Sequence, residues 1–191
     1  LVTLFVFAEG EQEVSAPSPT APEQVSEEDA QRGGTLVEAA RFAVGSLDPH
    51  CGSRREEVFH YLIFETLLSY DPEASDNVGP ALATSYEVVE PTVLEFTLRE
   101  GVKFHDGSVF NAEVAKWNIE RARDNEKSQV SETVENVKDV EIVDDYTIRL
   151  ILKDVEPILP LLLTPENGTT IFFASKKAFE TMGEEKFRRN P

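Results

Sequence analysis

One stretch of 28 residues, Leu94 to Arg121, constrains the fold more than any other part of the chain. It reads LEFTLREGVKFHDGSVFNAEVAKWNIER. Its first residues alternate between apolar and polar side chains, which predicts a strand with one buried face. A turn containing two glycines follows, and apolar residues at helical spacing complete the stretch. This change from strand to helix predicts an α+β fold, with helices packed on small antiparallel sheets.

The turn and the helix of this stretch have specific sequence signals. Asp106 and Gly107 predict a turn, because aspartate accepts a backbone hydrogen bond and glycine adopts positive φ at low cost. Asn111 is a favourable N-cap, and Glu113 lies near the positive end of the helix dipole. The helix is expected to continue to about Arg123.

Periodicity predicts further elements on both sides of this stretch. Helices are expected at Arg54–Tyr70, at Pro157–Leu163 and, capped by Ser175, over a last segment that reaches Phe187. Strands are expected at Thr35–Val44, Ser85–Val89, Val93–Arg99, Val137–Val143, Tyr146–Lys153 and Ile171–Ala174. The aromatic residues Tyr61, Phe64 and Trp117 lie on predicted apolar stripes and are expected in the core.

The formal net charge of −18 excludes several classes of partner. Nucleic-acid binding requires a basic surface, so no nucleic-acid partner is expected. Adsorption to anionic lipid is disfavoured for the same reason. The charge predicts a solubilising surface, with attraction of cationic ligands as a weaker alternative. The single cysteine, Cys51, excludes an internal disulfide and a zinc site built on a cysteine pair.

The first 32 residues predict an export signal and a linker. Residues 1–8 form an apolar run ending in Val6-Phe7-Ala8, which resembles a signal-peptidase site with cleavage after Ala8. The run is too short to cross a membrane and lacks a basic start, so a partial signal peptide is expected. Residues 9–32 are rich in Glu, Ser and Pro and predict a disordered linker. The predicted location is periplasmic or extracellular, and an accidentally apolar terminus is the alternative.

Enzymatic motifs are sparse. The sequence contains no Gly-x-Ser-x-Gly elbow and no phosphate-binding Gly-Lys-Ser or Gly-Lys-Thr loop. His50, Cys51 and His105 offer ligands for a metal-dependent hydrolase, which stays open as an alternative function. These residues have no recognised metal-ligand spacing, so no metal and no cofactor is expected.

Several motifs together resemble the bacterial extracellular solute-binding proteins of family 5, the peptide-, oligopeptide- and nickel-binding receptors of ABC importers. The most specific motif is Gly101-Val102-Lys103-Phe104-His105-Asp106-Gly107, with Phe110, Ala112 and Glu113. The other matching segments are 33–37, 46–49, 59–70, 80–86 and 190–191. Two positions depart from the family pattern: Val109 stands where proline is usual, and Val114 where aspartate is common.

The resemblance implies a periplasmic-binding-protein-like class II fold, in which two lobes close on a ligand. Family members are longer than this chain, so an N-terminal fragment with only the first lobe and its intervening subdomain is expected. The implied domains are an opening strand of lobe one at 33–45, an intervening α+β subdomain at 46–168 and a truncated return into lobe one at 169–191.

The resemblance also implies a binding function without catalysis. The expected ligand is a small peptide or related solute, and the expected partners are ABC permease subunits in the inner membrane. The full-length protein is expected to be a monomer. The ligand-binding residues are expected in two loops: Ser46, Leu47, Asp48 and Pro49 in the first, and Glu166 and Asn167 in the second. The alternatives are an ordinary exposed turn for each loop and a stand-alone adaptor for the whole chain.

Overall fold

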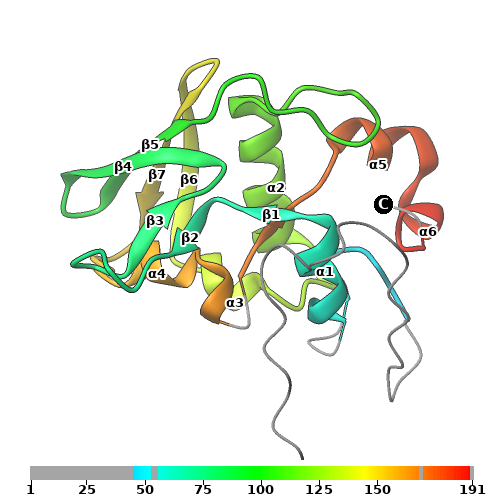
Figure 1. Ribbon diagram of the computed structural model, residues 1–191, viewed down its shortest axis with the longest axis horizontal. Helices are drawn as coiled ribbons and strands as arrows, with labels where there is room; N and C mark the ends of the chain where they lie inside the picture. Colours follow the sequence, from blue (N-terminus) through cyan, green and yellow to red (C-terminus); the bar gives the residue numbers. More distant parts are fainter. Residues whose placement is uncertain (1–44, 53–55, 168–169, 190–191) are drawn as a thin grey trace, which may run out of the picture. The chain divides into compact units, whose positions relative to one another are not determined.

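The computed structural model of the chain describes residues 45–52, 56–167 and 170–189 (Figure 1). All of these residues belong to the unit Ala40–Pro191. The predicted signal segment 1–8, the linker 9–32 and the strand Thr35–Val44 lie outside the described residues, as do Gly168, Asn190 and Pro191.

A four-stranded antiparallel sheet is the centre of the described structure. Its strands are β4 (Ala83–Glu90), β5 (Val93–Leu98), β6 (Val137–Asp144) and β7 (Thr147–Leu152), in the spatial order β4-β5-β7-β6. The register places Leu94 opposite Leu150 and Phe96 opposite Ile148, and all four side chains are buried. Alternate apolar residues therefore share one face, and both predicted hairpins are confirmed.

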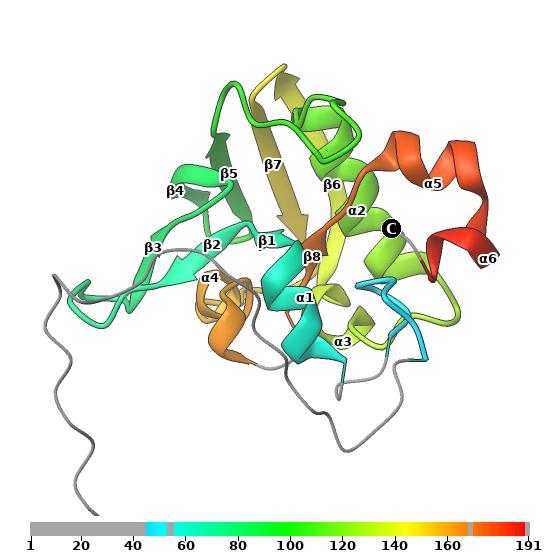
Figure 2. The same cartoon turned by 45° about the vertical axis from the view of Figure 1, so that its right-hand side comes forward.

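Helix α2 (Ala112–Asp124) packs across β6 and β7, as Figures 1 and 2 show. The side chain of Asn111 accepts a hydrogen bond from the amide of Val114 at 3.1 Å, which confirms the predicted N-cap. Ala115 and Ile119 are fully buried on the inner face of α2. The helix and the sheet thereby enclose the main hydrophobic core.

Glycines with positive φ form turns on both sides of α2 in the described structure. Gly107 has a φ of 77°, and the carboxylate of Asp106 accepts a hydrogen bond from the amide of Ser108 at 2.9 Å, as predicted. Gly183, with a φ of 75°, separates α5 (Lys176–Met182) from α6 (Glu184–Phe187). The predicted last helix is therefore two short helices.

The predicted helix Arg54–Tyr70 is wrong over its second half. Helix α1 covers Glu57–Ile63, and the chain then forms the short strands β1 (Glu65–Thr66) and β2 (Leu68–Tyr70). Strand β1 pairs with β8 (Phe172–Phe173), and β2 pairs with β3 (Val78–Pro80). These strand pairings, one with a segment more than 100 residues away and one with a nearby segment, outweigh the local helical spacing.

Short helices complete the described structure: α3 (Ser131–Val134), α4 (Leu159–Leu162) and the 3-10 helix η2 (Pro165–Asn167). None of the helices in the described ranges is both long enough and apolar enough to span a membrane.

Candidate functional site

The first candidate loop is a tight turn whose polar groups face inward. The amides of Cys51 and Gly52 donate to the carbonyl oxygen of Asp48, at 3.3 and 2.8 Å. The amide of Asp48 donates to Oγ of Ser46 at 3.1 Å. Ser46 and Asp48 are 3% and 0% exposed, and Pro49 is also buried, while Leu47 is half-buried. Three of the four predicted ligand-binding residues of this loop are therefore buried in this conformation.

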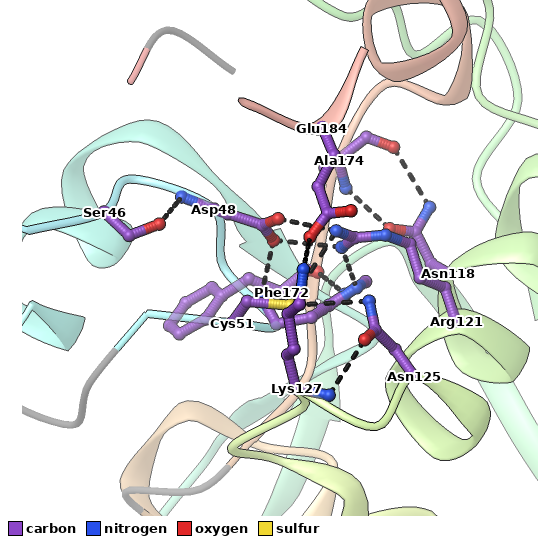
Figure 3. Close-up of polar contacts among 11 residues, drawn as sticks. Ser46, Asp48, Cys51, Asn118, Arg121, Asn125, Lys127, Phe172, Ala174 and Glu184 are labelled. Atoms are coloured by element: carbon purple, nitrogen blue, oxygen red, sulfur yellow. Dashed lines mark hydrogen bonds and ion pairs between the residues drawn. The ribbon is translucent and has the colours of Figure 1, made fainter. Parts of the chain in front are cut away.

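Arg121, in the last turn of α2, holds this loop (Figure 3). Its Nη1 donates to Oδ1 of Asp48 at 2.9 Å, and its Nη2 donates to Oδ2 at 2.5 Å. Nη1 also lies 2.8 Å from Nδ1 of His50, and Nη2 lies 3.9 Å from Sγ of Cys51. Such a two-pronged arginine–carboxylate pair fixes the orientation of both side chains.

The contacts of His50 fix its tautomer. An arginine can only donate, so Nδ1 of His50 accepts from Arg121. Nε2 therefore carries the proton and donates to the carbonyl oxygen of Phe172, 3.0 Å away. Burial, with the nearby charge of Arg121, lowers the pKa of His50 to about 4. The imidazole is neutral at physiological pH.

Two opposing effects act on the pKa of the Asp48 carboxyl. Burial alone raises the pKa of its carboxyl, but the hydrogen bonds and the charge of Arg121 outweigh burial and bring that pKa below its ordinary value. Burial also raises the pKa of the Cys51 thiol to about 11, and the charge of Asp48 acts in the same direction. The thiol is therefore a poor nucleophile.

Three aromatic rings surround the guanidinium of Arg121. Its Cζ lies 4.6 Å from the ring centre of Phe179, 5.6 Å from Trp117 and 5.7 Å from Phe187. Arginine stacks favourably on aromatic faces, so these rings from α2, α5 and α6 partly replace the water that the charge has lost. Sequence reasoning missed Arg121 because a charged residue in the last turn predicts solvent exposure. The signal was its spacing of four residues from Trp117, which places both on one helix face.

The second candidate loop, η2, lies against helix α1. The hydroxyl of Tyr61 donates to the carbonyl oxygen of Pro165 at 2.5 Å, and its ring meets that of Phe172 edge-on, with the centres 5.2 Å apart. Tyr61 is 45% exposed, so its predicted place in the core is wrong. Its hydroxyl reaches a loop carbonyl at the surface. Glu166 is exposed, and the side chain of Asn167 lies outside the described residues.

Phe172 connects the two candidate loops. Its carbonyl oxygen binds His50 of the first loop, and its ring contacts Tyr61, which binds the second. Strand β8 thus contacts the first loop directly and reaches the second loop through Tyr61 of helix α1, although the loops lie more than 100 residues apart in the sequence.

The structure gives no support to the alternative metal site. Both ring nitrogens of His50 are engaged, one of them by the cationic Arg121. His105 is exposed on the turn before α2. Over residues 45–52, 56–167 and 170–189, no three His, Cys, Asp or Glu side chains are arranged to hold a metal ion.

A mainly apolar pocket of about 350 Å³ lies elsewhere, between α5 and the turn at Phe104. Phe64, Phe173 and Met182 contribute to its wall. At its rim, Oγ of Ser175 donates to Oδ2 of Asp106 at 2.9 Å. This hydrogen bond fixes the turn to the start of α5 and leaves the apolar wall open.

Comparison with known proteins decides the family. A family profile described as bacterial extracellular solute-binding proteins, family 5 middle, matches residues 77–191. The chain belongs to this family. The nickel-binding periplasmic protein of Escherichia coli (strain K12) is 31% identical over 142 residues, which cover 73% of this chain and 27% of that protein. The glutathione-binding protein GsiB of the same strain is 31% identical over 152 residues, or 75% and 28% of the two chains.

Solved structures agree with the family assignment. MoaA from A. tumefaciens R10, in complex with mannopinic acid, superposes with a TM-score of 0.67 at 30% identity, covering 78% of this chain and 30% of that chain. NikA from Brucella suis, in complex with Fe(III)-EDTA, gives a TM-score of 0.59 at 32% identity, with 70% and 26% covered. These similarities confirm the family 5 resemblance and the class II periplasmic-binding-protein-like fold. The chain spans between 23% and 28% of the length of the first curated relatives that it matches.

Proposed function

We propose that this family 5 protein is part of an ABC-importer receptor that binds a peptide or a related small solute and releases it chemically unchanged. Its proposed partners are permease subunits of the inner membrane, and its proposed location is periplasmic or extracellular. The complete receptor is proposed to be monomeric. The domain divisions at 33–45, 46–168 and 169–191 belong to the same proposal.

One observation supports the binding role most directly. Strand β8 binds His50, directly after the loop Ser46–Pro49, and Tyr61 of helix α1 links β8 to Pro165, directly before Glu166–Asn167. Fixed loops on one support suit a binding surface, because little chain entropy is lost when a solute binds. The weakly nucleophilic thiol of Cys51 and the fully bonded ring of His50 fit a role without chemistry.

The names of the relatives define the solutes to test. They include a nickel-binding protein, a glutathione-binding protein and a structure with mannopinic acid. These ligands differ widely in chemistry, so the proposal extends to peptides and related small solutes rather than to one compound.

Calorimetry on the complete gene product that contains this chain tests the proposal. The titrants are di- to pentapeptides, glutathione, a nickel–histidine complex and mannopinic acid. We expect saturable binding of at least one titrant, and heats no larger than dilution for every titrant would overturn the peptide-or-related-solute proposal. Mass spectrometry of the released titrant should show it intact, and a cleaved product would contradict the non-catalytic role.

A further inference from the structure

The strongest feature that the proposed function leaves unexplained is the buried guanidinium of Arg121. Its side chain is only 6% exposed, and that of Asp48 is 0% exposed. Arginine is seldom buried so completely unless it is paired, because removing its charge from water is costly. Solubility of α2 does not require a buried arginine. The burial of Arg121 therefore indicates a specific role.

The contacts of Arg121 are concentrated on the first candidate loop. One guanidinium reaches the side chains of Asp48, His50 and Cys51, three of four consecutive residues (Figure 3). The other ring nitrogen of His50 ties the same turn to β8, because Nε2 donates to the carbonyl oxygen of Phe172. The loop is thus fixed between α2 and β8.

The backbone of the loop is also bonded inward. The amide of Leu47 donates to the carbonyl oxygen of Arg188 at 2.6 Å. The amide of Gln129 donates to the carbonyl oxygen of His50 at 2.8 Å. The amides of Gly45 and Ser46 both donate to the carboxylate of Glu56. Leu47 and Cys51 keep partly exposed side chains, so they form the surface that the loop can present to a solute.

We infer that Arg121 is a positioning residue, which holds the loop Ser46–Gly52 in its binding geometry through the carboxylate of Asp48. The inference rests on the proposed function. It gives Asp48 a supporting role in place of direct ligand contact, and it places solute contact on Leu47 and Cys51. Preorganisation of this kind raises affinity by removing the cost of ordering the loop during binding.

Hydrogen exchange measured by mass spectrometry on the complete gene product tests the positioning role without any ligand. The variants are Arg121→Lys, which keeps the charge but loses the planar fork, and Asp48→Asn, which keeps the shape. Both should speed exchange in peptides covering residues 46–52 by about tenfold or more, with exchange in β5 and β7 unchanged. Unchanged exchange in the loop, or equal acceleration everywhere, would overturn the inference.

Arg123 provides the matched control on the same helix. It donates to the backbone of Val137 and Lys138 and pairs with Asp124, and none of these contacts in the described structure reaches the loop. Arg123→Met should lower the thermal midpoint while leaving exchange at residues 46–52 within about twofold of the wild type. Equal loosening of the loop in this variant would show that α2 acts only as general support.

Affinity provides the second readout. For a titrant that the wild type binds, Arg121→Lys should raise Kd by about tenfold at a temperature where the variant is fully folded, and Arg123→Met should not. An unchanged Kd in Arg121→Lys would overturn the role in binding. If the wild type binds no titrant, the proposed function fails, while the exchange experiment still decides whether Arg121 holds the loop.

Discussion

Asp48 and Arg121 lie 73 residues apart in the sequence and form a buried ion pair, with Oδ1 2.9 Å from Nη1 and Oδ2 2.5 Å from Nη2. The pair closes the first candidate loop against helix α2. A buried pair of this kind contributes little net stability compared with apolar residues, but it is strongly destabilising when only one partner is removed. Its removal therefore tests how the loop is held.

Single and double substitutions of this pair should have unequal effects. Arg121→Met leaves the carboxylate of Asp48 buried without its partner and should lower the free energy of unfolding by about 3–5 kcal/mol. The double variant Asp48→Asn/Arg121→Met carries neither charge, so it should lose clearly less than the sum of the single losses. Urea unfolding of the wild type, Arg121→Met, Asp48→Asn and the double variant measures this coupling. Additive losses would show that the two side chains act independently.

Stability should fall in mild acid because of His50. Its pKa is about 4 in the folded protein and 6.5 in its ordinary state. The unfolded chain therefore binds a proton that the folded chain does not, and the free energy of unfolding declines as pH falls from 6.5 through 4. Burial also lowers the pKa of His60, which adds to the decline in the same direction.

Urea unfolding between about pH 7 and about pH 4 measures this decline. His50→Gln keeps one donor and one acceptor but does not titrate, so this variant should show a shallower dependence on pH. A dependence as steep as that of the wild type would mean that other groups cause it.

The thiol of Cys51 should react slowly in the folded protein. Its pKa rises from 9.0 to about 11, so near pH 8 the folded chain holds about a hundredfold less thiolate than an ordinary cysteine. Iodoacetamide labelling with and without urea measures the difference. Asp48→Asn removes a charge that raises this pKa and should speed labelling, whereas Asp139→Asn, exposed on β6, should not. Equal rates in folded and unfolded protein would contradict the prediction.

Asn118 should be hard to replace although it is uncharged. It is 0% exposed, accepts from the amide of Ala174 at 2.8 Å and donates to the carbonyl oxygen of Ala174 at 3.0 Å. Asn118→Ala leaves both backbone groups of Ala174 without this partner and should cost about 1–3 kcal/mol in urea unfolding. Asn118→Asp retains only the acceptor and buries a charge, so it should cost more. A cost within error of zero for Asn118→Ala would show that water replaces the amide.

Local signals predicted the regular elements well. The strand at Val93, the cap at Asn111 and the turn at Gly107 each depend on residues close together in the sequence, and the structure confirms them. The second half of the helix predicted over Arg54–Tyr70 was wrong because residues 65–70 pair with strands elsewhere in the chain. Helical spacing carries no information about such partners.

The candidate site shows the same division. The family resemblance predicts ligand-binding residues in the segment Ser46–Pro49, which stays a prediction, and it gives no partner for the carboxylate of Asp48. Only the folded chain brings Arg121 to that carboxylate and aromatic rings from α5 and α6 to the guanidinium. The role of Arg121 depends on contacts across more than 70 residues, so the helical pattern of α2 could not reveal it.

The sequence by itself determined the family, the α+β class, the central hairpins and the boundaries of α2, because motifs and periodicity are local properties of the chain. Tertiary structure alone decided which polar residues are buried, which carbonyl His50 binds and how Tyr61 links Phe172 of β8 to Pro165 of η2. Burial and charge pairing arise when distant segments meet, and a linear pattern does not record those meetings.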